Sequence, residues 1–150
     1  AYRDYYHERL VLYLERLKNL DEYVKNQVKS IPDNKRILIT AHDAYEYFGQ
    51  AYGFTVVGLQ GISTESYVST GDVKRLVQII VDHDIPVIFA EASIPVRNIE
   101  AVQKAVEARG KHVAIGPQLY SDALGPQGSV ADNYIGMMQY TIDTLVALLV

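Results

Sequence analysis

Histidine and acidic side chains follow several short apolar segments of this chain, and together they could do chemistry. His42 and Asp43 come directly after one such segment, Glu91 comes directly after another, and Asp122 lies beyond a third. A neutral imidazole nitrogen and a carboxylate oxygen are both good ligands for zinc or manganese. The same groups serve as general acids and bases. These residue types therefore leave three interpretations open: a divalent-metal site, an acid–base catalytic site, or roles in structure alone.

The elements that must position these residues are predicted by the hydrophobic pattern. Four apolar runs are short and do not alternate with polar residues, which is typical of strands buried on both faces. These runs are Arg36–Thr40, Phe54–Leu59, Pro86–Ala90 and His112–Ile115, and helical patterns cover about 43–52, 70–83, 95–109 and 131–149. The alternation of strands and helices predicts an α/β fold, a three-layer lobe with a four-stranded parallel sheet flanked by helices.

The carboxyl edge of the predicted sheet is where these side chains are expected to meet, because ligands bind there in open α/β folds. The residues that follow the four strands are Ala41, His42 and Asp43; Gln60, Gly61, Ser63, Thr64 and Glu65; Glu91, Ser93 and Arg97; and Tyr120, Ser121 and Asp122. His42 and one carboxylate are only two donors, whereas a closed divalent site usually needs four or more. Further donors would have to come from Glu65, Glu91, water or a second lobe.

Structural roles are the alternative for each of these residues. His42 is expected to open a helix, where a histidine can cap or pack, and Asp43 is then a first-turn carboxylate stabilised by the helix dipole. Glu91 can be a buried carboxylate that holds a loop by hydrogen bonds. His83 lies between two aspartates, but neighbours in a helix do not share a face, and it lies at the opposite end of the sheet. We expect His83 to be a solvated surface residue.

The N-terminal 30 residues are predicted to form one long helix. Apolar residues recur there every three or four positions in a single stripe: Tyr6, Leu10, Tyr13, Leu17, Leu20, Val24 and Val28. At 1.5 Å per residue the helix would be about 45 Å long, about twice what a small α/β lobe needs. We expect residues 1–30 to be a backbone helix between two lobes and residues 31–150 to be one of these lobes. The pattern starts without a capping box, so we expect the chain to be a fragment of a longer protein.

Composition argues against several other classes of protein. Hydrophobic residues make up 49% of the chain and charged residues 21%, which is typical of globular proteins and not of disordered ones. The chain has no cysteine, so thiol catalysis and cysteine-ligated metal centres are excluded. Its net charge of −4 argues against nucleic-acid binding. Glycine-rich nucleotide motifs, a nucleophile elbow and an apolar run of about 18 residues are all absent from the sequence.

The segment TAHDAYEYFGQAY, at residues 40–52, resembles a known family. It is similar to the TroA-like metal-binding proteins, the solute receptors of zinc and manganese ABC transporters. Three further stretches agree: VVGLQGISTES (56–66), IPVIFAEASIPVRNIEAV (85–102) and LYSDALGPQGSVADNYIGMMQYTIDTLVALL (119–149). The long N-terminal helix is similar to the rigid helix that spans both lobes of these receptors. The resemblance therefore covers nearly the whole chain.

The resemblance implies a set of ligands. The family binds one divalent ion between two lobes, with two ligands from each lobe. Its H/E-x-A-F/Y-x-Y-F motif puts the third ligand at His42, and its F/Y-x-D-x-L/M-G motif puts the fourth at Asp122. Glu91 matches a position beside the site, where it would orient a ligand or serve as an additional one. The nitrogen donor at His42 suits zinc best, with manganese and iron as the other candidates.

The resemblance also implies partners and a location. An N-terminal lobe supplies the other two ligands, and an ABC transporter permease in the membrane receives the ion. Capture and delivery involve no chemical reaction, so the protein is not expected to be an enzyme. Such a receptor acts in the periplasm or on the cell surface, with a lipid anchor in its N-terminal part as one means of attachment.

Two other functions follow from the residues without the resemblance. One is a metal-independent α/β enzyme in which His42 is the general base and Asp122 or Glu91 is its partner. The other is an interaction module whose apolar stripe, from Tyr6 to Val28, binds a partner helix. Loss of metal binding when His42 or Asp122 is replaced would distinguish the receptor from both.

Overall fold

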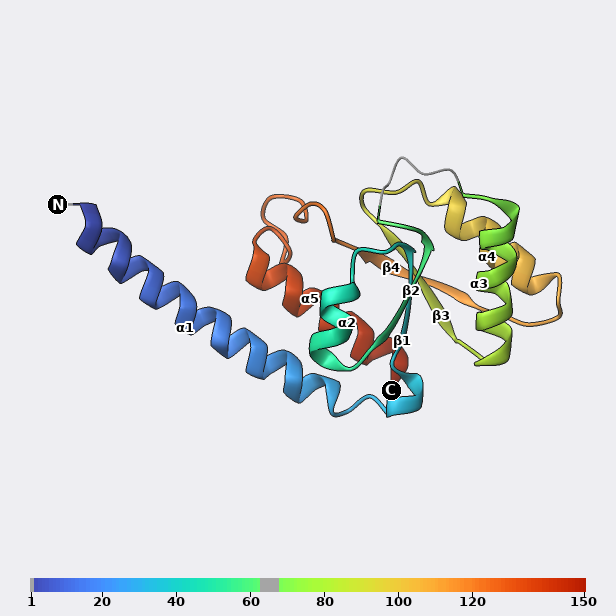
Figure 1. The fold of residues 1–150 in the computed structure, drawn as a ribbon, viewed down its shortest axis with the longest axis horizontal. Coiled ribbons are helices and arrows are strands. Elements are labelled where there is room, and N and C mark those ends of the chain that lie inside the picture. Colours follow the sequence, from blue (N-terminus) through green and yellow to red (C-terminus); the bar gives the residue numbers. More distant parts are fainter. Residues whose placement is uncertain (1, 63–67) are drawn as a thin grey trace.

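Strands and helices alternate through residues 2–62 and 68–150, which the computed structural model describes (Figure 1). The elements are α1 (Tyr2–Val28), a short 3-10 helix (Asp33–Lys35), β1 (Ile37–His42), α2 (Glu46–Tyr52), β2 (Thr55–Gln60), α3 (Thr70–Asp82), β3 (Val87–Glu91), α4 (Arg97–Glu107), β4 (Ala114–Leu119) and α5 (Tyr134–Leu149). The strands form one sheet in the order β2-β1-β3-β4, and all neighbours in it are parallel. The predicted α/β fold with a four-stranded parallel sheet is confirmed.

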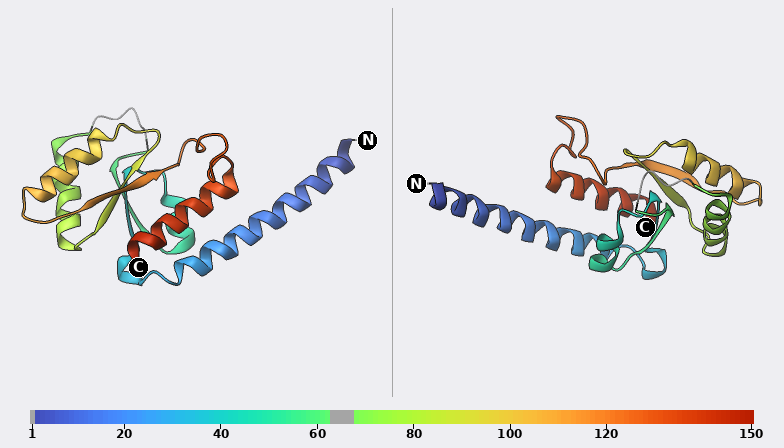
Figure 2. Two further views of the ribbon diagram at one scale, coloured as in Figure 1. Left: turned by 180° about the vertical axis from the view of Figure 1, so that it is seen from behind. Right: turned by 45° about the horizontal axis from the view of Figure 1, so that its top comes forward.

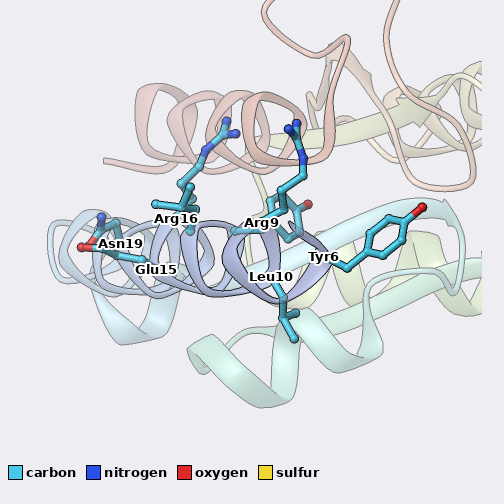
Figure 3. A pocket seen from close by; sticks show the side chains of 8 residues that line it. Tyr6, Arg9, Leu10, Glu15, Arg16 and Asn19 are labelled. Atoms are coloured by element: carbon cyan, nitrogen blue, oxygen red, sulfur yellow. The ribbon is translucent and has the colours of Figure 1, made fainter. Parts of the chain in front are cut away.

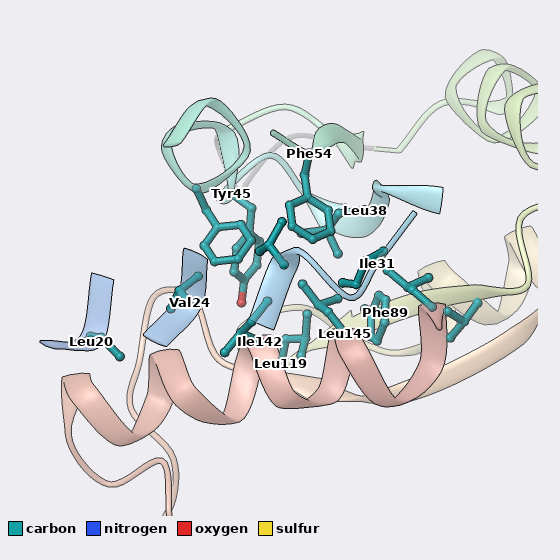
Figure 4. Packing of buried hydrophobic residues seen from close by; sticks show 14 residues of the cluster. Leu20, Val24, Ile31, Leu38, Tyr45, Phe54, Phe89, Leu119, Ile142 and Leu145 are labelled. Atoms are coloured by element: carbon teal, nitrogen blue, oxygen red, sulfur yellow. The ribbon is translucent and has the colours of Figure 1, made fainter. Parts of the chain in front are cut away.

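The two faces of the sheet carry two hydrophobic clusters. Side chains alternate between faces along a strand, so Leu38 of β1 and Phe89 of β3 lie on one face and Ile39 and Ile88 lie on the other. The C-terminal end of α1, together with α2 and α5, covers the first face, and α3 and α4 cover the second (Figure 2). Figure 4 shows the cluster of the first face, where Ile142 of α5 packs toward the sheet. We call this side of the sheet the α5 face.

The two central strands are buried, whereas the two edge strands are only partly so. Every residue of β3 and all but the first of β1 are buried, while β2 and β4 contain exposed positions. The expectation that all four strands are buried on both faces is therefore wrong for β2 and β4. An edge strand has a neighbouring strand on one side only, so solvent reaches it from the other.

The fourth strand lies later than the sequence predicts. The prediction was His112–Ile115, but β4 runs from Ala114 through Gly116 and Pro117 to Leu119. A glycine followed by a proline indicates the end of a strand. Proline is nevertheless tolerated in an edge strand, because on the outer side of such a strand no neighbouring strand needs a hydrogen bond from its backbone nitrogen. The hydrophobic pattern therefore marks the start of β4 but misses its second half.

A register shift in β4 sets where its carboxyl end lies. Phe89 of β3 pairs with Gly116, whereas Glu91, two residues on, pairs with Leu119, so β4 contains one additional residue between the two pairs. Gly116 is required beside this irregularity, because a Cβ atom there would lie 2.7 Å from the Phe89 ring. The shift places Leu119, and the loop after it, beside Glu91.

The helices begin and end within a few residues of their predicted bounds, with one difference that concerns the site. The sequence predicts a helix over 43–52 that His42 opens, but His42 is the last residue of β1 and α2 starts only at Glu46. The His42 carbonyl accepts hydrogen bonds from the Ala44 N–H and the Thr40 hydroxyl instead of starting a helix. At the other end, Gly53 terminates α2 with a φ of 75°, a conformation that glycine adopts without strain.

Helix α1 is about 40 Å long, and its two halves differ. Its C-terminal half buries Leu20, Val24 and Val28 against the lobe. Its N-terminal half projects away from the lobe and exposes large apolar side chains, among them Tyr6 and Leu10 (Figure 1). In the described part of the chain no helix combines the length and the apolar character needed to cross a membrane.

Candidate functional site

The register of the central strands brings His42 and Glu91 together. Thr40 of β1 pairs with Phe89 of β3, and both strands continue for two more residues, so His42 and Glu91 end their strands side by side. Because side chains alternate, His42 lies on the same face as Leu38, and Glu91 on the same face as Phe89, which is the α5 face. Two residues that are 49 positions apart therefore meet at the carboxyl edge, as predicted.

Glu91 accepts two hydrogen bonds from His42, one from its backbone and one from its imidazole. Its Oε1 atom lies 2.9 Å from the backbone nitrogen of His42 and 2.9 Å from the ring nitrogen Nδ1. His42 is 1% exposed and Glu91 0% exposed, so both groups are removed from water. Because Oε1 already accepts from the backbone N–H, it is the acceptor of the second bond as well, and Nδ1 is the donor. The other ring nitrogen, Nε2, is left to face outward.

Asp122 lies at the outward side of the ring. Its Oδ2 atom is 3.1 Å from Nε2 of His42, and its side chain is 49% exposed. The residue before it, Ser121, donates a hydrogen bond of 2.6 Å to Oε2 of Glu91. The imidazole of His42 therefore lies between two carboxylates, one buried behind it and one open to solvent in front of it.

A buried tyrosine holds the start of the loop that carries Asp122. The hydroxyl of Tyr45 donates to the carbonyl of Tyr120 over 2.9 Å. Burial raises the pKa of the Tyr45 hydroxyl, and the nearby charges of Glu91 and Asp122 raise it further. Tyr45 therefore keeps its proton at neutral pH and remains a donor to the loop.

The remaining candidates do not join this cluster. Asp43 lies in a bend before α2 rather than in the first turn of a helix, which corrects its predicted role, and its Oδ1 atom is buried with no hydrogen-bond partner among the described residues. Gln60 ends β2 next to His42, and its Nε2 atom also lacks a partner in the described part of the chain. Ser93 and Arg97 are exposed. Three further candidates, Ser63, Thr64 and Glu65, lie outside the described residues.

Two contributors to the site were missed or undervalued by sequence reasoning. Ser121 is one of the candidates at the strand ends without an assigned role, and Tyr45 is not among the candidates. Their hydrogen bonds span 30 and 75 residues of the chain, respectively. The only available signal was position, because Ser121 directly precedes Asp122 and Tyr45 follows His42 by three residues.

The cluster offers one imidazole nitrogen and one carboxylate oxygen to a ligand in front of it. Within residues 2–62 and 68–150, no group of three or more histidine, cysteine, aspartate or glutamate side chains is arranged to hold a metal ion. A pocket of about 710 Å³ lies elsewhere, along the exposed half of α1, where Tyr6, Arg9 and Arg16 are among its lining residues (Figure 3). It contains none of the site residues, so the candidate chemistry lies at the sheet edge and not in that pocket.

Comparison with known proteins identifies the family of the chain. The family model described as "ZnuA: Zinc-uptake complex component A periplasmic" matches residues 1–148. The zinc-binding protein TroA of Treponema pallidum (strain Nichols) is 47% identical over 142 residues, which cover 95% of this chain and 46% of that protein. The manganese-binding lipoprotein MntA of Bacillus subtilis (strain 168) is 42% identical over 133 residues, which cover 89% of this chain and 44% of that protein.

A solved structure is also similar to this chain. The periplasmic zinc-binding protein TroA from Treponema pallidum superposes with a TM-score of 0.93 at 47% sequence identity, over 95% of this chain and 52% of that one. The chain spans about half the length of the curated relatives it matches. The predicted resemblance to TroA-like proteins is confirmed, and the chain belongs to the family of ZnuA, the periplasmic component A of zinc-uptake complexes.

Proposed function

We propose that this chain is the metal-binding lobe, with its spanning helix, of an extracytoplasmic solute-binding protein that captures a divalent transition-metal ion for an ABC transporter. The observation that carries the proposal is the pair of donor atoms at the carboxyl edge, Nε2 of His42 and Oδ2 of Asp122, which lie 3.1 Å apart. The metal is the cargo, which is bound, carried and released unchanged. We therefore propose no enzymatic activity.

The separation of the two donors supports a single shared ion. Two ligand atoms at about 2.1 Å from a tetrahedral zinc ion lie about 3.4 Å from each other, which is close to the 3.1 Å between Nε2 of His42 and Oδ2 of Asp122. A metal ion binds the deprotonated forms of such ligands, so a proton held by either atom is released when the ion binds. Because His42 is buried and held from behind by Glu91, the ion approaches from the half-exposed side of Asp122.

Zinc is the ion that we propose, with manganese and iron as the other candidates. An imidazole nitrogen is a softer donor than a carboxylate oxygen and favours zinc. A relative that is 47% identical is named for zinc binding and another that is 42% identical is named for manganese binding. Relatives named as metal-binding proteins cover the whole site, which favours a receptor over the metal-independent enzyme with His42 as its base.

Two donors are too few for a closed site, so we propose that a second lobe supplies two further ligands. Residues 1–30 form the backbone helix between the lobes, and residues 31–150 form the lobe described here. Support comes from the exposed apolar side chains on the N-terminal half of α1 and from relatives about twice as long as this chain. The partner that receives the ion is an ABC transporter permease. By analogy with the periplasmic and lipoprotein relatives, the receptor lies outside the cytoplasm.

Titration of the chain with zinc chloride, followed by calorimetry, tests the proposal. We expect weak one-to-one binding that is lost in His42→Ala and in Asp122→Ala. His83→Ala is the matched control, since His83 is exposed at the opposite end of the sheet, and it should bind zinc as the unchanged chain does. Tight binding by these two donors alone, or equal binding by Asp122→Ala in a folded chain, contradicts the proposal.

A further inference from the structure

Ser121 is the link between the two donor residues. Its hydroxyl donates to Oε2 of Glu91 over 2.6 Å, and the other oxygen of the same carboxylate accepts from the backbone N–H and from Nδ1 of His42, each over 2.9 Å. Asp122 is the next residue in the chain. One buried carboxylate therefore connects the ring that carries Nε2 to the backbone that carries Oδ2.

The loop that follows β4 needs such an anchor. Residues 120–133 contain no regular helix or strand, and the side chain of Asp122 is 49% exposed, so little packing holds its carboxylate in front of His42. Tyr45 fixes the loop at the carbonyl of Tyr120, which is two residues before Asp122. The bond from Ser121 to Glu91 supplies the second fixed point, directly beside Asp122.

We propose that Ser121 is a positioning residue of the site, which acts through Glu91 to hold the imidazole of His42 and the carboxylate of Asp122 in one fixed relation. Its effect on metal affinity rests on the proposed function, but its effect on the imidazole does not. Loss of a hydrogen bond behind a metal ligand typically lowers affinity by about 10-fold to 100-fold. We expect the lower end for Ser121, because Glu91 keeps both of its bonds to His42.

The experiment compares three variants of the chain. Ser121→Ala removes the hydroxyl, Ser121→Thr keeps it, and Ser93→Ala is the matched control, an exposed serine at the same edge of the sheet. Nitrogen-15 NMR of the metal-free chain reports the Nδ1–H group of His42, and calorimetry with zinc chloride reports affinity. We expect Ser121→Ala to shift or broaden the Nδ1–H signal and to weaken zinc binding by about 10-fold. Ser121→Thr and Ser93→Ala should leave both unchanged.

The outcomes separate this proposal from the function on which it rests. An Nδ1–H signal in Ser121→Ala identical to that of the unchanged chain overturns the positioning role. If that signal changes but zinc binding is the same in His42→Ala as in the unchanged chain, the positioning role stands and the proposed function fails. An equal effect of Ser121→Thr and Ser121→Ala also overturns the proposal, because the hydroxyl would then not be the group that acts.

Discussion

The two ends of the sheet each contain a histidine near carboxylates, and only one of them forms a site. At the amino end, His83 lies between Asp82 and Asp84 in the sequence, and all three residues are exposed. At the carboxyl end, His42 is buried and has carboxylates from two other parts of the chain on its two ring nitrogens. The amino end has its potential ligands closer together in the sequence, but within the described part of the chain they form no such cluster.

The difference shows what builds a site in this fold. Neighbours along a helix end point in different directions, so the side chains of Asp82, His83 and Asp84 do not converge. The ends of parallel strands lie side by side, and their residues meet whatever their distance along the chain. Burial then strengthens the contact between Glu91 and His42, because no water competes with Glu91 for the imidazole.

Removal of Glu91 should have the largest effect at the carboxyl end. Glu91→Ala leaves the backbone N–H of His42 and its Nδ1 without their buried acceptor, and we expect the free energy of unfolding to fall by about 3–5 kcal/mol. Glu107→Ala, at an exposed position of α4, should change it by less than about 0.5 kcal/mol. Urea denaturation measures both. Equal losses of stability in the two variants would mean that the buried carboxylate at the carboxyl end contributes no more than an exposed one.

The second largest loss of stability is expected when a side chain is added beside the register shift of β4. In Gly116→Ala the added Cβ atom lies 2.7 Å from the Phe89 ring, and we expect a loss of about 1–3 kcal/mol in the free energy of unfolding. Gly61→Ala is the control, since no atom of the described residues lies within 4 Å of its Cβ position. Thermal denaturation followed by circular dichroism measures the pair. An unchanged stability in Gly116→Ala would show that β4 or the Phe89 ring shifts at no cost to make room for the added methyl group.

Loss of the tyrosine anchor should have a smaller effect. Tyr45→Phe removes the hydrogen bond to the carbonyl of Tyr120, and we expect the free energy of unfolding to fall by about 1 kcal/mol. Tyr47→Phe makes the same change on a side chain that is 87% exposed, and it should have no measurable effect. Chemical denaturation of the two variants tests this contrast, which disappears if the Tyr45 hydroxyl is not a buried donor.

The smallest effect is expected at the amino end. The hydrogen bond from Lys111 and its charge hold the pKa of Asp84 below its usual 3.8. A lowered native pKa stabilises the fold at pH values above about 4, and this contribution is lost as the pH falls through the native pKa. Lys111→Ala should therefore return the pKa of Asp84 toward 3.8 and slightly lower the melting temperature at pH 7 but not at pH 2. An NMR titration of the Asp84 carboxyl carbon checks the shift, and no change in its midpoint would contradict the pairing.

Much of the fold was predictable because its signals are local. The apolar runs that form β1 and β3, the helical periodicity of α3 and α4 and the long stripe of α1 all depend on residues close together in the sequence. The end of β4 was not predictable, because Gly116 and Pro117 indicate a turn unless the strand lies at the edge of its sheet. The start of α2 was misplaced because the carbonyl of His42 accepts other hydrogen bonds.

By itself, the amino-acid sequence determined the parallel α/β architecture and put His42, Glu91 and Asp122 at one edge of the sheet, since the carboxyl ends of parallel strands must lie together. Only the tertiary structure decided that Glu91 holds the ring of His42 from behind, that Ser121 joins that carboxylate to the loop of Asp122, and that Nε2 and Oδ2 come within 3.1 Å. These contacts join residues 30 to 80 positions apart. They depend on strand register and on one additional residue in β4, and no local pattern in the chain encodes either.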